Sequence, residues 1–293
     1  MVTRSRVLVS SACYDPAVVS ARSLSVHPLT PAIGAEIHGV DLNQPVEPPV
    51  FAQVHHALTA HQVIFFRDQD LTVERHVAFG RLFGELAVHP NDPGLAGHPE
   101  VMIIHADGNS KRVAGERWHS DVSCDSEPPM GSILHLHTVP PMGGDTLFSS
   151  MYAAYEALSE PVRAWLGTLQ AEHDGAPYYR SVNAIIGRDD GGRSYPKAVH
   201  PVIRTHPVSG RKSIFVNEMF TTRIVGLARD ESDAVLAFLF RHVQRTEFQC
   251  RFRWAPHSIA FWDNRCTQHM AIWDYFPHTR SGYRVTVRGE RPV

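Results

Sequence analysis

The sequence predicts a mainly β fold of the α+β type, a double-sheet jelly roll (double-stranded β-helix) with helical insertions. Three observations predict it: many short apolar runs divided by Pro and Gly, few helical patterns, and helices lying away from the candidate metal ligands. The chain has 293 residues without an internal repeat or linker. We therefore expect a poorly ordered N-terminal extension over residues 1–22 and a single jelly-roll domain over residues 23–293.

Apolar or β-branched runs bounded by Pro, Gly or polar residues predict the strands. In chain order, these runs lie at residues 25–29, 34–40, 63–66, 100–105, 131–137, 146–148, 202–204, 213–216, 259–262 and 283–287. The run Val63–Phe66 is a candidate for a buried strand because all four residues are apolar. The apolar runs are too short to span a bilayer, so we expect no membrane association.

Helical spacing of apolar residues predicts five helices, at residues 51–61, 72–83, 150–158, 159–169 and 230–243. Thr72 and Ser159 are suitable N-caps. The residues expected to face the core are Val54, Ala57 and Leu58, then Val73, Val77 and Leu82, then Ala234, Val235, Phe238, Leu239 and Val243. Residues 175–198 have low apolar content and paired glycines, which predict an irregular loop, either a lid or a plain surface excursion.

Composition excludes several function classes. The formal net charge of −2 gives no basic excess, so we expect no nucleic-acid partner. The four cysteines (Cys13, Cys124, Cys250 and Cys266) are scattered, which favours free thiols in a reducing, cytoplasmic compartment and argues against a thiolate zinc site. A short targeting peptide at the N-terminus is an open alternative. We also expect a homo-oligomer, either a dimer or a tetramer.

The pair His119 and Asp121 is the candidate metal site. In an extended segment, side chains two residues apart point the same way, so both can reach one metal ion. His269 is the candidate third ligand, and two histidines with one carboxylate form the facial triad of non-haem iron enzymes. A second pair of this kind, His105 and Asp107, runs directly into a polar turn and is the weaker candidate.

Two other interpretations of these residues, each from a different class of protein function, remain open. A zinc hydrolase also uses two histidines and a carboxylate, although the helical His-x-x-x-His pattern typical of such sites is missing around His119 and His269. A non-catalytic jelly-roll binding protein would make the three ligands incidental.

Several motifs together resemble the Fe(II)- and 2-oxoglutarate-dependent dioxygenases, in particular the taurine dioxygenase group. These motifs are Trp118–Val122, Gly143–Thr146, Thr205–Lys212, Asn217–Ile224, Trp262–Arg265 with Thr267–His269, Arg280 and Tyr283–Thr286. The resemblance runs from about Leu24 to the C-terminus. It implies a jelly-roll dioxygenase domain that uses ferrous iron, 2-oxoglutarate as co-substrate and O2.

The resemblance also implies roles for individual residues. It gives His119, Asp121 and His269 to the iron, and Thr146 and Arg280 to the distal carboxylate of 2-oxoglutarate. An arginine fork suits a carboxylate because it donates two parallel hydrogen bonds.

For the substrate, the resemblance implies that His89 and Arg284 hold a sulfonate and that Tyr179 and Phe220 wall the pocket. The amine-binding side departs from taurine dioxygenase, with Gly115 in place of an asparagine and Asp92 near the position of a tyrosine. The expected reaction is hydroxylation of a small anionic substrate, such as the sulfonate taurine, with release of sulfite and an aldehyde. An alkyl sulfate, an aryloxyalkanoate or a natural-product carboxylate is the alternative substrate.

Overall fold

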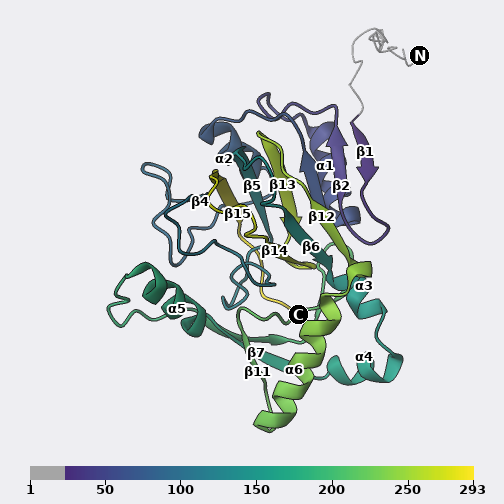
Figure 1. Cartoon of the computed structure of the whole chain (residues 1–293). Helices are drawn as coiled ribbons and strands as arrows, with labels where there is room; N and C mark the ends of the chain where they lie inside the picture. Colours follow the sequence, from purple (N-terminus) through teal and green to yellow (C-terminus); the bar gives the residue numbers. More distant parts are fainter. Residues whose placement is uncertain (1–23) are drawn as a thin grey trace, which may run out of the picture.

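The computed structural model describes residues 24–293, so the extension predicted at residues 1–22 lies outside the described part. Seven strands form the main sheet in the order β1-β2-β3-β13-β5-β15-β4 (Figure 1). Their bounds are β1 Ser25–Pro28, β2 Ala35–His38, β3 Val63–Phe66, β4 Val101–Ala106, β5 Gly131–Thr138, β13 Ser258–Asp263 and β15 Arg280–Val287. All pairs in it are antiparallel except β2 with β3.

A smaller sheet, in the order β12-β6-β14, faces the main one. It contains β6 Thr146–Ser150, β12 Gln249–Phe252 and β14 Thr267–Ala271. Alternate residues of the main sheet pack against it: Phe65 stacks on Phe252 with ring centroids 3.9 Å apart, and Trp262 contacts Phe148. Two sheets that enclose one apolar core confirm the predicted jelly roll.

The other face of the main sheet is covered by α1 (Pro48–His61) and α2 (Val73–Arg81). Ile64, Phe66 and Phe261, which alternate with the inner residues, pack there. Because successive side chains of a strand point to opposite faces, each continuous apolar run supplies residues to both cores.

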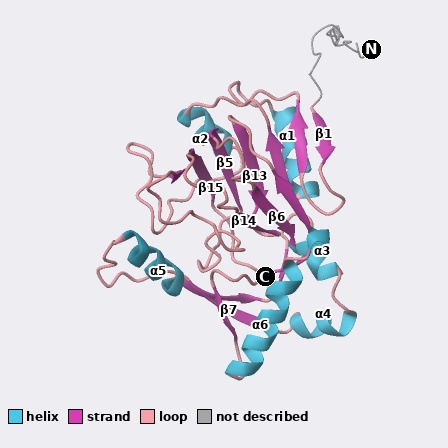
Figure 2. Cartoon of the chain, in the orientation of Figure 1, coloured by secondary structure: helices cyan, strands magenta, loops and turns pink. Residues whose placement is uncertain are grey.

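The second half of the chain adds helices and two small sheets at one end of the molecule (Figure 2). The helices are α3 Met151–Glu156, α4 Glu160–Leu166, α5 Ala176–Ile186, α6 Arg229–Val243 and the 3-10 turn η1 Thr246–Phe248. One sheet has the order β11-β7-β8 and the other pairs β10 with β9. Their strands are β7 Gln170–Asp174, β8 Lys197–Pro201, β9 Ile203–Thr205, β10 Lys212–Ile214 and β11 Thr221–Ile224.

All five predicted helices are present, with three errors in their inner faces. Val54, Ala57 and Leu58 are buried in α1, and the Thr72 hydroxyl caps α2 by accepting a hydrogen bond from the Arg75 backbone N–H. Leu82 and Phe238, predicted to face the core, are instead each 42% exposed, and Ala234 is exposed as well. Leu82 lies just past the end of α2, while in α6 the buried apolar face runs through Leu236, Leu239 and Val243.

The irregular loop predicted over residues 175–198 is wrong for its first half, where α5 forms. The Asp174 carboxylate accepts from the Ala176 backbone N–H, Pro177 occupies the first turn, and Gly187 ends the helix in the left-handed conformation. Tyr179 and Val182 are buried one turn apart. The apolar spacing was present in the sequence, but the following glycines hid it.

The cysteines of the described part agree with the prediction of free thiols. Cys124, Cys250 and Cys266 are buried and unpaired, while Cys13 lies outside the described residues. Within residues 24–293, none of the helices has both the length and the apolar character required to cross a bilayer.

Candidate metal centre and substrate cavity

Three side chains from distant parts of the chain meet at the centre of the site: His119, Asp121 and His269. One ligand atom of each lies within 4.8 Å of the others, and all three residues are buried. The Asp121 Oδ1 atom is 3.6 Å from His119 Nε2 and 4.0 Å from His269 Nε2. We call these residues the triad.

The backbone brings the triad together through a single β-bridge between His119 and His269. Each residue donates its N–H to the carbonyl of the other, at 3.1 and 2.9 Å. His269 belongs to β14 of the smaller sheet. The predicted extended segment around His119 is therefore only one bridge long, and a turn begins at Asp121. Val122 has a φ of +45°, which is unusual for a β-branched residue and marks strain beside the site.

Hydrogen bonds to the remote atoms orient two residues of the triad, His119 and Asp121. His119 Nδ1 donates to the Arg117 carbonyl at 2.7 Å, which leaves the lone pair on Nε2. Asp121 Oδ2 accepts from the Ser132 hydroxyl at 2.7 Å, and the Asp121 N–H donates to the Asn264 side-chain oxygen at 3.3 Å. Two imidazole nitrogens and one carboxylate oxygen thus converge, a donor set that fits a ferrous ion.

The charges around the triad favour this donor set. Burial works against ionisation of Asp121, but Arg284 and the two histidines hold the pKa of its carboxyl well below the usual value. Burial and the neighbouring His119 push the pKa of His269 well below the usual value, so its ring is neutral. An Arg284 guanidinium N–H donates to Asp121 Oδ1 at 2.9 Å.

A second group, Thr146 and Arg280, lies at the starts of β6 and β15. Arg280 is buried and donates to the Gly144 carbonyl at 3.1 Å and to the Thr146 hydroxyl at 3.3 Å. The Trp254 indole N–H also donates to Thr146, at 3.0 Å. No ion pair of the described residues includes Arg280, and burial lowers the pKa of its guanidinium to about 10. A buried guanidinium without a carboxylate partner fits a small anion such as the distal carboxylate of 2-oxoglutarate.

A cavity of about 470 Å³ opens beside the triad. Of the nine residues with a predicted role, those that line it are His89, His119, Asp121, Tyr179, Phe220 and Arg284. Thr146, His269 and Arg280 are not among its lining residues.

His89 and Arg284 lie on one wall of the cavity. His89 Nδ1 accepts from the Asn91 backbone N–H at 3.2 Å, so its proton sits on Nε2. Burial, helped by the charge of Arg284, lowers the pKa of His89 to about 4, and the ring is neutral at pH 7. The Arg284 Nε atom is buried without a partner among the described residues. The pair therefore offers N–H donors to an anion.

The positions that depart from taurine dioxygenase also face the cavity. Gly115 has a φ of +79°, and a Cβ atom there would lie 3.1 Å from the His119 ring. Asp92 lines the cavity, but its Oδ1 atom accepts from the Gly94 backbone N–H at 2.9 Å. Neither position offers an amide or phenol group for a substrate amine.

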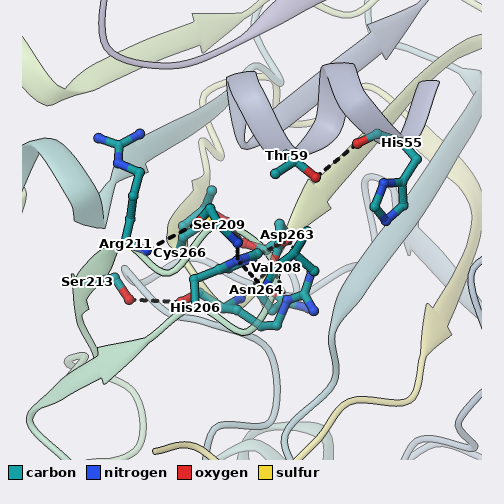
Figure 3. A network of polar contacts seen from close by, with 12 residues as sticks. His55, Thr59, His206, Val208, Ser209, Arg211, Ser213, Asp263, Asn264 and Cys266 are labelled. Atoms are coloured by element: carbon teal, nitrogen blue, oxygen red, sulfur yellow. Dashed lines mark hydrogen bonds and ion pairs between the residues drawn. The ribbon is translucent and has the colours of Figure 1, made fainter. Parts of the chain in front are cut away.

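A second buried group of metal-ligand types consists of His206, Asp263 and Cys266 (Figure 3), and Arg265 pairs with its carboxylate. We call it the Asp263 cluster. Arg265 donates to both Asp263 carboxylate oxygens, at 2.9 and 2.7 Å, and His206 Nε2 donates to Oδ2 at 3.0 Å. His206 Nδ1 accepts from the backbone N–H groups of the following turn. Both histidine nitrogens and both carboxylate oxygens are engaged, so this cluster is structural.

Sequence reasoning included the Asp263 cluster only as part of two motifs, Thr205–Lys212 and Trp262–Arg265. In the structure it ties these motifs together, because His206 of the first motif donates to Asp263 of the second. The Ser213 hydroxyl, one residue past the first motif, adds a hydrogen bond to the Arg265 carbonyl at 3.0 Å. The weaker pair runs into a polar turn as predicted: His105 lies within β4, and the Asp107 carboxylate accepts hydrogen bonds from Asn109 and Ser110 in the turn that follows.

Comparison with known proteins decides the family. The family model described as "Taurine catabolism dioxygenase TauD, TfdA family" matches residues 25–286, almost the whole described chain. The chain belongs to the TauD/TfdA family. It is an Fe(II)- and 2-oxoglutarate-dependent dioxygenase that uses O2, which rules out the zinc hydrolase and the non-catalytic binding protein.

Three relatives illustrate the range of this family. An alpha-ketoglutarate-dependent sulfate ester dioxygenase of Pseudomonas putida is 36% identical over 281 residues, covering 93% of this chain and 92% of the relative. The crystal structure of a taurine dioxygenase from Burkholderia xenovorans has a TM-score of 0.81 and 39% identity, covering 92% of this chain and 93% of that chain. The crystal structure of AAD-2 in complex with Mn(II) and N-oxalylglycine has a TM-score of 0.76 and 29% identity, covering 92% and 99%.

Proposed function

We propose that this dioxygenase oxidises a small organic sulfonate or sulfate ester at the carbon next to the anionic group. The observation that carries the proposal is the pair His89 and Arg284, which presents N–H donors on a cavity wall beside Asp121. Similarity to a sulfate ester dioxygenase and to a taurine dioxygenase supports the same substrate class.

In this proposal the triad holds the ferrous iron. The Arg117 carbonyl fixes the His119 tautomer and Ser132 fixes the Asp121 carboxylate, so both present a lone pair to the same point. The iron, once bound with 2-oxoglutarate and O2, supplies the oxidising power for C–H hydroxylation, with succinate and CO2 as products.

Thr146 and Arg280 bind the distal carboxylate of 2-oxoglutarate. The guanidinium is held by the Gly144 carbonyl and the Thr146 hydroxyl, so it is oriented before the co-substrate arrives. The cost of burying an unpaired guanidinium is offset when the carboxylate binds.

His89 and Arg284 bind the substrate anion, and Tyr179 and Phe220 wall its organic part. Both aromatic residues are buried, with ring centroids 5.9 Å apart. Holding the anion at a fixed point places the neighbouring carbon toward the triad and keeps water from it. Hydroxylation at that carbon gives an unstable adduct: a sulfonate releases sulfite and an aldehyde, and a sulfate ester releases sulfate and an aldehyde.

Gly115 and Asp92 favour substrates other than taurine within this class. Gly115 has no side chain, and Asp92 is a carboxylate with one oxygen bonded to the Gly94 N–H, so neither supplies the amide or phenol group that the resemblance assigns to amine binding. The cavity of about 470 Å³ lies in the range of drug-sized sites. We therefore propose a substrate with an organic body larger than two carbons.

A coupled assay tests the proposal. Purified enzyme with Fe(II), ascorbate and 2-oxoglutarate is presented with a panel of alkyl sulfonates, alkyl sulfates and aryloxyalkanoates. Succinate should form in step with sulfite from a sulfonate or sulfate from an ester. Succinate coupled only to aryloxyalkanoates, with no sulfur anion released from any compound, would overturn the substrate class.

The variant His89→Ala tests whether substrate binding depends on the proposed anion site. Loss of its hydrogen bond to an anion should raise KM on the order of 10-fold. His56→Ala is the matched control, since this histidine is exposed on α1 and does not line the cavity. Equal effects of the two variants would contradict the role of His89.

A further inference from the structure

The outer part of the cavity carries unpaired positive charge. Lys111, Arg112 and Arg188 line it, and no ion pair of the described residues includes any of them. Apart from Asp121, the only acidic residue in the lining is Asp92, whose carboxylate already accepts from the backbone of Gly94. This region therefore differs from an ordinary solvated surface, where opposite charges are interspersed.

Arg112 is the best-placed of these cations. Lys111 and Arg188 are exposed, but Arg112 is half-buried, and its NH2 group donates to the Tyr178 hydroxyl at 2.8 Å. Its guanidinium carbon lies 5.7 Å from the centre of the Tyr178 ring, and its Nε atom is buried without a partner among the described residues. The hydrogen bond to Tyr178 thus orients the guanidinium, and its other N–H groups have no partner among the described residues.

Two aromatic rings connect Arg112 with the inner anion site. The Tyr178 ring, which Arg112 contacts, packs against Tyr179 with ring centroids 5.5 Å apart, and Tyr179 packs against His89 at 6.0 Å. The apolar residues of the cavity lining include Met102, Val122, Val182, Met219 and Phe220. A substrate whose only charge sits against His89 and Arg284 would leave the donors of Arg112 unsatisfied. A substrate with an apolar body and a second anionic group would bind both the His89 and Arg284 pair and Arg112.

We propose that Arg112 is a specificity-determining residue that binds a carboxylate at the far end of the substrate. The substrate class is then an amphipathic dianion, a sulfonate or sulfate ester that carries a terminal carboxylate. The planar fork of a guanidinium matches a carboxylate in geometry and charge. This inference rests on the proposed function for the inner anion site and adds the outer one.

Equilibrium binding tests the inference separately from turnover. Isothermal titration compares alkyl sulfates of graded chain length that end in a methyl, a hydroxyl or a carboxylate group. At the best-fitting length, the carboxylate should bind at least 10-fold more tightly than the methyl compound, as expected for one charge-assisted hydrogen bond. No preference for the carboxylate at any length overturns the inference.

Variants assign the preference to Arg112. In Arg112→Gln the Kd of the carboxylate compound should rise about 10-fold while that of the methyl compound stays constant, and Arg112→Lys should recover part of the preference. Arg229→Gln is the control for net charge, because Arg229 is exposed on α6 and pairs only with Asp233. Equal weakening of both ligands by Arg112→Gln, or the same effect from Arg229→Gln, contradicts a specific contact.

The two proposals fail in different ways. If the methyl compound binds and is oxidised but the carboxylate brings no gain, only the role of Arg112 is lost. If neither compound yields coupled succinate, the proposed function fails, and the Kd ratio still reports on Arg112.

Discussion

The triad and the Asp263 cluster are built from the same kinds of residue, yet their hydrogen bonding differs. Each contains a buried histidine and aspartate with ligand atoms within 4.8 Å of one another. In the Asp263 cluster, Arg265 and His206 occupy both carboxylate oxygens. In the triad, Ser132 occupies Asp121 Oδ2, and Arg284 donates only one hydrogen bond to Oδ1, which leaves a second lone pair on that oxygen. His119 Nε2 accepts no hydrogen bond from the described residues and faces Asp121 Oδ1.

The types of ligand residue and the short distances between their ligand atoms therefore do not by themselves define a metal site. What defines it is a set of lone pairs left unused by the surrounding protein. The pKa of Asp263 is also held below its usual value: burial opposes this, but Arg265 and then His206 outweigh it. A depressed carboxyl pKa therefore accompanies both roles, and only the unused lone pairs separate them.

The largest expected effect comes from Asp121→Asn. It removes the only negative ligand of the triad, so affinity for Fe(II) should fall by about 100-fold or more and succinate formation should be lost. Asp107→Asn, in the other His-x-Asp pair, is the control and should leave both unchanged. Titration with Co(II) measures the metal affinity of both variants. If Asp121→Asn bound Co(II) as tightly as wild type, the triad would not differ from the Asp263 cluster in metal binding.

The equivalent change in the other cluster, Asp263→Asn, should affect folding instead of metal binding. It leaves Arg265 buried without its carboxylate, and breaking a buried pair costs about 3–5 kcal/mol. Urea denaturation of the metal-free protein should show this loss in the free energy of unfolding. The remaining folded protein should bind one metal ion with the affinity of wild type.

Much of this organisation could be predicted from the sequence. The unbroken apolar run at Val63–Phe66 predicts a buried strand, and Thr72 predicts the start of a helix because its hydroxyl can cap it. Two of the proposed metal ligands, His119 and Asp121, could be predicted because they are neighbours in the chain and carry a recognisable motif.

Other features depend on contacts between distant segments, which a single sequence does not show. The bridge between His119 and His269, the strained turn at Val122 and the hydrogen bond from Ser132 to Asp121 all require the folded sheets. The hydrogen bond from Arg112 to Tyr178 likewise joins a loop to helix α5, 66 residues further along the chain. Arg112 carried no sequence signal beyond its charge.

A smaller effect separates the supporting contacts of the two clusters. Ser132→Ala removes the donor to Asp121 Oδ2, and metal affinity should fall about 10-fold because the carboxylate is less well oriented. Ser213→Ala removes the donor to the Arg265 carbonyl and should cost about 1 kcal/mol of stability without changing metal affinity. If Ser213→Ala weakens metal binding as much as Ser132→Ala, the two clusters are not independent.

The smallest effect is expected from Cys266→Ala, and it addresses the Asp263 cluster directly. Burial raises the pKa of the Cys266 thiol well above its usual value, so the group keeps its proton and makes a poor metal ligand. The variant should lose about 1 kcal/mol of stability or less and bind the same number of metal ions as wild type. Co(II)-loaded wild-type protein should show no thiolate-to-cobalt charge-transfer absorption. Such a band, lost in Cys266→Ala, would mean that Arg265 can be displaced from Asp263 and that hydrogen-bond saturation does not protect this cluster from metals.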